Sequence, residues 1–207
     1  MYKLYHFPFS QHARRVVTLL EAAGLPYTLE HVAMDAGEHL TPAYLAINPN
    51  RQVPTLVCDG LKIHESTAIM RYLCNRHGLE DWYPSALPVR AEIDQWVDWT
   101  QSRMAQAVID IVFNSVFAPA HMRDHAAIER GKARMSELAP MIEARLDGRD
   151  WIAGTDRPSI ADVVIASNIS QLQLAGWRPA NGNFKAWYGR VCAIEAFAKT
   201  LPEMEAA

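Results

Sequence analysis

The chain has 207 residues, about 1.4 domains of typical size, so it forms one large domain or two small ones. Half of its residues are hydrophobic and 21% are charged, and 10 glycines and 12 prolines are too few for a low-complexity chain. This composition excludes a disordered or fibrous protein. The formal net charge of −3, without a basic run that could follow a phosphate backbone, argues against a nucleic-acid partner.

The cysteines and the apolar segments indicate a cytoplasmic protein. Cys58, Cys74 and Cys192 are odd in number, far apart and without a C-x-x-C pair, which fits neither a disulfide framework nor a zinc ribbon. Met1 is followed directly by Tyr-Lys-Leu-Tyr, so we expect no secretory signal. Residues 104–120 form the most apolar stretch, but polar residues interrupt it and it is shorter than the roughly 20 residues that span a bilayer. We predict a buried helix there and no membrane segment.

The first 77 residues alternate short β-branched or aromatic runs with helical patterns, which is typical of β-α-β units. The predicted strands are residues 2–5, 27–32, 55–57 and 62–64, and the predicted helices are residues 12–23, 42–46 and 65–76. We expect a small mixed sheet with helices on it.

The rest of the chain has no strand signal, and apolar residues recur there at spacings of three and four. Long helices are expected over residues 93–111, 123–146 and 159–174, and shorter ones over residues 183–190 and 194–200. Pro140 should kink the second of them. The predicted fold is therefore α/β plus all-α: a first domain over residues 1–77, a linker over 78–88 and an all-helical domain over 89–207.

Charge and histidine content favour the first domain as the place where a small anion binds. Residues 1–78 carry seven basic and six acidic side chains, and the remainder carries 13 and 17. Six of the eight histidines also lie in the first part.

Ser10 is a candidate for chemistry because it lies between the first strand and the first helix. Backbone N–H groups point outward at a helix start and the helix dipole favours negative charge, so a thiolate would be stabilised there. Alternatively, Ser10 is only an N-cap residue.

Two further positions could hold a peptide ligand. Val53-Pro54 enters a strand after a loop; a cis bond there would present the Val53 backbone to an extended peptide, whereas an ordinary trans proline at a strand start would not. Glu65-Ser66 opens the third helix, so Ser66 and the helix N–H groups could take a carboxylate while Glu65 pairs with an ammonium. An α-amino acid end would fit both, but favourable capping alone also explains this pair.

The order and spacing of several short motifs resemble those of the cytosolic glutathione transferases. The motifs are Leu4-Tyr5, Ser10-Gln11-His12-Ala13-Arg14, Gly37-Glu38-His39-Leu40, Asn48-Pro49-x-x-Gln52-Val53-Pro54-Thr55-Leu56 and Glu65-Ser66-x-Ala68-Ile69. The S-Q-x-x-R and G-x-H-L elements are most similar to theta-class and theta-like bacterial members. The resemblance covers residues 2–77, and beyond them Ser159-Ile160-Ala161-Asp162 is similar to the family's capping box.

The resemblance implies a thioredoxin-like first domain that binds glutathione. It implies that Ser10 hydrogen-bonds the glutathione sulfur, that the Val53 backbone pairs with the cysteinyl unit, and that Pro54 is the cis-proline. It also assigns Glu65 and Ser66 to the γ-glutamyl group.

The glycyl end of glutathione is assigned in the same way. His39 matches a residue that contacts the glycyl carboxylate. Gln52 stands where theta-class proteins often have lysine, so its neutral amide is expected to hold the anion more weakly.

The resemblance also implies the reaction, the partners and the assembly. The glutathione thiolate attacks a small hydrophobic electrophile by aromatic substitution, addition, halide displacement or peroxide reduction, without a metal, and the protein is a homodimer. The helical domain supplies most of the electrophile pocket, and its candidate residues are Phe7, Phe9, Arg103, Gln106 and Phe113. These five side chains could equally be buried packing residues.

Two other functions remain as alternatives. A non-catalytic glutathione-transferase-like binding or regulatory protein would share this fold. A thiol–disulfide reductase would need a cysteine near the first helix start, where this chain has Ser10-Gln11. His121 and His125 are four apart, but they lack a third ligand nearby and an H-E-x-x-H arrangement, so we predict no metal site.

Overall fold

The computed structural model describes residues 1–180 and 182–201. Its contacts divide the chain into two compact units: residues 1–79 with the segment from Glu195 onward, and Glu80–Ile194. This division differs from the predicted boundaries of 77 and 89. The last short helix joins the first unit because it packs against the first helix of that unit.

The first unit contains a four-stranded mixed sheet, as predicted. Its strands are β1 (Tyr2–His6), β2 (Tyr27–His31), β3 (Thr55–Cys58) and β4 (Leu61–His64), in the order β2-β1-β3-β4. β1 runs parallel to β2 and antiparallel to β3, and β3 forms a hairpin with β4. Leu4 and Leu56 face each other in the register of β1 and β3 and are fully buried, so the core lies under the two central strands.

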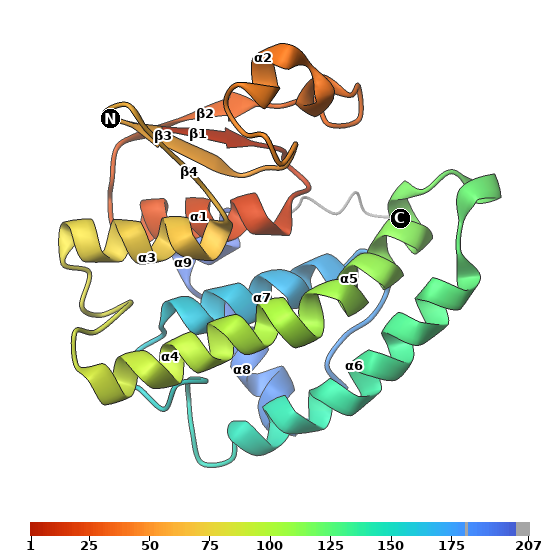
Figure 1. Cartoon of the computed structure of the whole chain (residues 1–207). Helices are drawn as coiled ribbons and strands as arrows, with labels where there is room; N and C mark the ends of the chain where they lie inside the picture. Colours follow the sequence, from red (N-terminus) through yellow and green to blue (C-terminus); the bar gives the residue numbers. More distant parts are fainter. Residues whose placement is uncertain (181, 202–207) are drawn as a thin grey trace. The chain divides into compact units, whose positions relative to one another are not determined.

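Four α-helices and a short 3₁₀-helix complete this unit. They are α1 (Gln11–Ala22), α2 (Pro42–Leu45), α3 (Ser66–His77), α9 (Glu195–Ala198) and the 3₁₀-helix Glu38–Leu40. α1 and α3 lie together on one face of the sheet and α2 lies on the other (Figure 1). Arg14 Nε donates to the Thr200 carbonyl at 2.8 Å, which ties the end of the described chain to α1.

Within its described residues the second unit contains helices and no strand, as predicted. α4 (Leu87–Trp99), a π-helical turn (Thr100–Met104), α5 (Ala105–Val112) and a second π-helical turn (Phe113–Phe117) follow one another without a break. A 3₁₀ turn (Ala120–Met122), α6 (His125–Arg145), α7 (Ile160–Gln173) and α8 (Gly182–Cys192) complete the unit. Pro140 lies inside α6, whose helical assignment continues through it.

α7 forms the centre of the second unit and packs against α4, α5 and α8. A capping box links Ser159 and Asp162 at its start. The buried Asp162 carboxylate also accepts hydrogen bonds from the Ile152 N–H and from Trp187 Nε1, both at 2.8 Å. Burial raises the pKa of Asp162. These bonds join the loop before α7 to α8 inside the core.

The predicted burial of residues 104–120 is wrong for one side of the helix. Met104, Val108, Ile111 and Val112 are buried. On the opposite side Ile109, Phe113, Val116 and Phe117 are 39–54% exposed. Neighbouring helices cover only part of a helix circumference, so apolar content alone did not show which side faces solvent.

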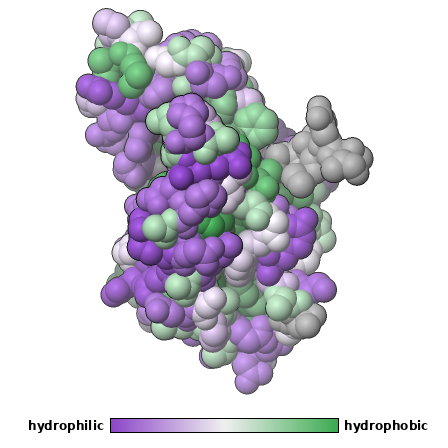
Figure 2. All heavy atoms as spheres, turned by 90° about the vertical axis from the view of Figure 1, so that its right-hand side faces the viewer, coloured by the Kyte–Doolittle hydropathy of each residue, from purple (hydrophilic) through white to green (hydrophobic). Residues whose placement is uncertain are grey.

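On the face in Figure 2 hydrophilic residues predominate, and hydrophobic ones gather in small groups. No helix in the part of the chain that the structure describes is long and apolar enough to cross a membrane.

Candidate functional site

Ser10 is the N-cap of α1. Its Oγ accepts a hydrogen bond from the Ala13 N–H at 3.2 Å, and its own N–H donates to the Phe7 carbonyl at 2.9 Å. The side chain is half-buried. Because Oγ acts as an acceptor in the cap, the hydroxyl proton remains available for a ligand, so the N-cap role and a role in chemistry are compatible.

The loop before β3 carries the Val53 backbone, to which the resemblance assigned the pairing with the cysteinyl unit. The Val53–Pro54 bond is cis, as predicted. The Gln52 carbonyl accepts hydrogen bonds from Tyr44 Oη at 2.7 Å and from Asn48 Nδ2 at 2.8 Å. Asn48, only 1% exposed, also donates to Thr55 Oγ1 at 3.0 Å. Sequence reasoning used Asn48 only as a motif residue and missed that it holds this loop.

Glu65 and Ser66 begin α3 in an unusual backbone conformation. Glu65 has φ 68° and ψ 105°, a region that costs a non-glycine residue about 1–3 kcal/mol. Its carboxylate is exposed and makes no hydrogen bond or ion pair with a described residue, whereas Ser66 is 3% exposed. Such strain is concentrated at ligand sites, which supports a binding role at this turn.

A small hollow of about 50 Å³, here called the α3 cleft, collects these residues. Its lining residues are His12, Asn48, Gln52, Val53, Pro54, His64, Glu65 and Ser66. Five of them were predicted as binding residues from the sequence. His12, Asn48 and His64 were not: His12 and Asn48 belong to the quoted motifs, but no local pattern gave any of the three a binding role.

Ser10 and His39 lie outside this lining. His39 belongs to the 3₁₀-helix Glu38–Leu40 and is half-buried. Its Nδ1 is buried and has no hydrogen-bond partner among the described residues. The assignment of His39 to the glycyl carboxylate therefore stays a prediction.

An acidic group lines the α3 cleft, and a buried basic group lies behind it. Arg15 is fully buried and donates from Nη1 to Ser66 Oγ at 3.4 Å. Burial and the neighbouring Arg14 lower the pKa of Arg15 to about 9, so it stays cationic at neutral pH. The exposed Glu65 carboxylate lies next to Ser66 in the chain. A ligand end that carries both a carboxylate and an ammonium matches this arrangement.

Two of the predicted electrophile contacts belong to the first unit. Phe7 is half-buried and packs against a cluster formed by Val32, Tyr44 and Val53. Phe9 is 46% exposed, with its ring centroid 5.8 Å from that of Phe7. Packing against this cluster thus explains why the Phe7 side chain is half-buried. It does not explain the position of the exposed Phe9 side chain.

The other three belong to the second unit. Arg103, Gln106 and Phe113 are all exposed, so none is the buried packing residue that the alternative required. Gln106 Nε2 donates to Asp110 Oδ1 at 2.7 Å. Phe113 belongs to the exposed apolar side described above and is 54% exposed.

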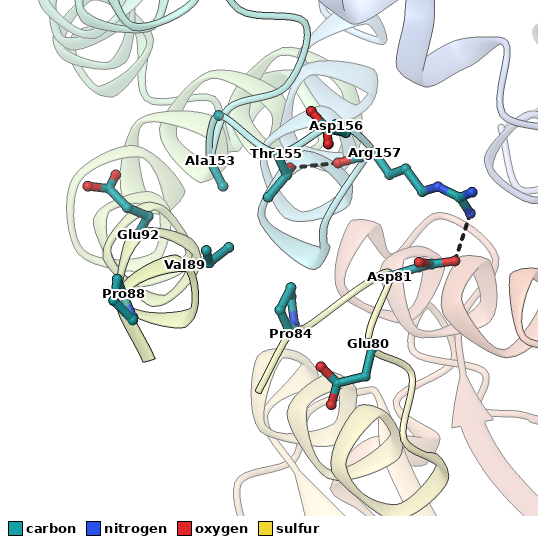
Figure 3. A pocket seen from close by; sticks show the side chains of 11 residues that line it. Glu80, Asp81, Pro84, Pro88, Val89, Glu92, Ala153, Thr155, Asp156 and Arg157 are labelled. Atoms are coloured by element: carbon teal, nitrogen blue, oxygen red, sulfur yellow. Dashed lines mark hydrogen bonds and ion pairs between the residues drawn. The ribbon is translucent and has the colours of Figure 1, made fainter. Parts of the chain in front are cut away.

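A much larger cavity, of about 630 Å³, lies in the second unit (Figure 3). Four of its lining side chains are carboxylates: Glu80, Asp81, Glu92 and Asp156. Arg157 Nη1 lies 2.8 Å from Asp81 Oδ2. A dashed line marks this ion pair in Figure 3. Glu80 accepts from the Ser85 N–H at 2.7 Å, and Glu92 pairs with Arg145 at 2.7 Å. This acidic lining does not fit an anionic peptide.

No group of three or more His, Cys, Asp or Glu side chains within residues 1–180 and 182–201 is placed to hold a metal ion.

Comparison with known proteins assigns the chain to a family. It is 31% identical over 196 residues to the glutathione S-transferase GstB of Escherichia coli K12, with 93% of each chain covered. The chain belongs to the glutathione S-transferase family. The family's N-terminal domain profile matches residues 4–81, and its C-terminal domain profile matches residues 126–190.

Similarity to theta-class glutathione S-transferases confirms the predicted class. Glutathione S-transferase theta-1 of Mus musculus is 26% identical over 91% of this chain and 81% of its own length. A crystal structure of the theta-class glutathione S-transferase of Xanthomonas axonopodis pv. citri with glutathione bound has a TM-score of 0.90 and 32% identity, and it covers 99% of each chain.

Proposed function

We propose that this chain is a serine-type glutathione transferase that binds glutathione at the α3 cleft and activates its thiol at Ser10 for attack on a hydrophobic electrophile. The observation that carries the proposal is the exposed Glu65 carboxylate, which has no partner among the described residues and lies next to the buried Ser66, itself hydrogen-bonded to the buried Arg15. The glutathione-bound relative from Xanthomonas axonopodis pv. citri supports the same ligand.

Each part of glutathione has a proposed partner. Ser66 and the first N–H groups of α3 take the γ-glutamyl carboxylate, and Glu65 takes the γ-glutamyl ammonium. The Val53 backbone pairs with the cysteinyl unit next to Pro54. His39 and the amide of Gln52 take the glycyl carboxylate.

Ser10 promotes the reaction by stabilising the thiolate. A free thiol with a pKa of about 8.5 is only about 3% ionised at pH 7. Lowering this pKa to about 6.5 raises the ionised fraction to roughly 75% and requires about 2.7 kcal/mol. The Ser10 hydroxyl donates to the sulfur, and the α1 N-terminus adds its dipole. The thiol proton leaves to solvent and the sulfur electron pair forms the new bond to carbon. In a substitution the halide leaves with the electron pair of the broken bond, and in an addition the displaced π electron pair takes up a proton from solvent. Ser10 itself is not covalently modified.

We propose Phe7 and Phe9 as the electrophile contacts of the first unit. Arg103, Gln106 and Phe113 are the electrophile contacts that we propose within the second unit. The two functional domains are accordingly a glutathione-binding domain and a helical domain that supplies electrophile contacts. Detoxification of hydrophobic electrophiles in the cytoplasm is the role that this chemistry serves.

Glutathione calorimetry combined with conjugation assays tests the proposal. The assays use aryl halides, isothiocyanates, hydroperoxides and haloalkanes as electrophiles. We expect glutathione binding and turnover of at least one class. Binding without turnover of any class supports the non-catalytic alternative, and no binding contradicts the proposal.

We also propose that the protein is a homodimer, as is usual in its family. Analytical ultracentrifugation at micromolar concentration is expected to give twice the chain mass of 23.3 kDa. Sedimentation at the mass of one chain would contradict this part of the proposal.

A further inference from the structure

His12 is a polar residue in the first turn of α1 that sequence reasoning gave no role. It lines the α3 cleft together with Glu65 and Ser66. Its side chain is half-buried, between the buried Gln11 and Ala13 in the sequence. Its imidazole makes no hydrogen bond or ion pair with any residue in the described part of the chain. A half-buried polar group of this kind normally has a hydrogen-bond partner. A ligand that enters the cleft from its open side can supply that partner.

The imidazole is neutral at physiological pH. Burial and the nearby Arg15 charge lower the pKa of His12 to about 3. A neutral imidazole has one donor and one acceptor nitrogen. The acceptor nitrogen needs a ligand N–H or O–H group.

The other residues of the cleft indicate which ligand group donates to the acceptor nitrogen of His12. In the proposed binding mode Ser66 and the α3 N–H groups face the ligand carboxylate. The buried Arg15 adds positive charge beside Ser66, to which it donates a hydrogen bond. Glu65 is the one acidic residue in the lining of the cleft, and in the same binding mode it faces the ligand ammonium. An ammonium has three N–H donors, more than one carboxylate normally takes, so it has a donor to spare.

We propose that His12 is a binding residue of the α3 cleft and accepts a hydrogen bond from the α-ammonium of the γ-glutamyl group, beside Glu65. The proposal rests on glutathione being the ligand of this cleft. His12 thereby makes the cleft select peptides with a free γ-glutamyl amino group.

The test measures binding of two ligands to matched variants. The ligands are glutathione and its deamino analogue, in which hydrogen replaces the α-ammonium. His12→Phe removes the acceptor and keeps a ring, while His12→Gln restores an acceptor. Glu65→Ala serves as the reference for a group that contacts the ammonium.

We expect His12→Phe to weaken glutathione binding by about 10- to 100-fold, in line with one hydrogen bond to a charged group. The affinities of the deamino analogue for wild type and for His12→Phe should agree within about twofold, because the analogue has no ammonium that could donate to His12. His12→Gln should recover much of the glutathione affinity. His12→Phe should raise KM for glutathione and leave kcat at saturating glutathione nearly unchanged.

Other outcomes overturn the inference and separate it from the proposed function. Equal losses for both ligands would mean that His12 acts on the carboxylate or on the fold, and no loss for glutathione would mean that it does not touch the ligand. If Glu65→Ala weakens glutathione binding and His12→Phe does not, only the inference fails. If wild type does not bind glutathione, both fail.

Discussion

The α3 cleft of the first unit and the large cavity of the second unit differ in size and in chemistry. The cleft holds about 50 Å³ and the cavity about 630 Å³. Three of the four carboxylates of the cavity, Glu80, Asp81 and Glu92, are bound to groups of the same unit, and the fourth, Asp156, is exposed. In the cleft, Glu65 and His12 make no hydrogen bond with any described residue. Polar groups without partners among the described residues, rather than volume, are therefore the basis on which we propose that the cleft is the binding site.

The largest expected effect concerns Asp162 of the second unit, whose carboxylate accepts hydrogen bonds from residues of the same unit. Asp162→Ala leaves buried donors of Ile152, Ser159 and Trp187 without an acceptor. We expect a loss of about 4 kcal/mol in the free energy of unfolding, measured by urea denaturation. The exposed Asp156 is the matched control, and Asp156→Ala should cost less than about 0.5 kcal/mol. Similar losses in the free energy of unfolding of the two variants would mean that a hydrogen-bonded buried carboxylate and an exposed one contribute equally to stability, which would contradict this comparison.

The next effect concerns Ser10, whose hydroxyl proton is available to a ligand. Ser10→Ala should lower turnover by about 10- to 1,000-fold, or about 1.4–4 kcal/mol, and leave much of the glutathione binding intact. The apparent pKa of bound glutathione should rise, so raising the pH should restore part of the rate. Steady-state kinetics against pH measures both effects.

The control for this variant is Ser102→Ala, which changes an exposed serine of the second unit and should leave the rate unchanged. If Ser10 is only an N-cap, its alanine variant loses about 1 kcal/mol of stability and keeps its pH profile. Full activity at neutral pH would rule out the role in thiol activation.

The smallest effect concerns the ion pair beside the large cavity. The side chains of Arg157 and Asp81 are 70% and 67% exposed, so Arg157→Ala should cost only about 0–1 kcal/mol of stability. Glutathione affinity, measured by calorimetry, should change by less than about twofold. A loss of more than tenfold would place a glutathione contact in the second unit.

Local patterns were sufficient for most elements and for the residues that lie next to one another in the cleft. Gly78, with φ 60°, ends α3 where the sequence predicted it, and Ser159 and Asp162 form the expected capping box. Such features depend on neighbouring residues, which the sequence shows directly.

Contacts between distant residues could not be predicted in this way. Arg15 reaches Ser66 across 51 positions, and His12 and Glu65 line the same cleft because α1 and α3 pack together. The exposure of Phe113 depends on which side of its helix the neighbouring helices cover. Each of these is set by tertiary packing, which single-sequence periodicity does not report.

Glutathione affinity of two glutamate variants tests the central claim most directly. Glu65 lines the α3 cleft and Glu80 lines the large cavity. By isothermal titration calorimetry, Glu65→Ala should bind glutathione about 10- to 150-fold more weakly than wild type, because it loses the charged partner of the γ-glutamyl ammonium. Glu80→Ala should bind it as wild type does. Unchanged affinity in Glu65→Ala, or a loss of similar size in Glu80→Ala, would contradict the account.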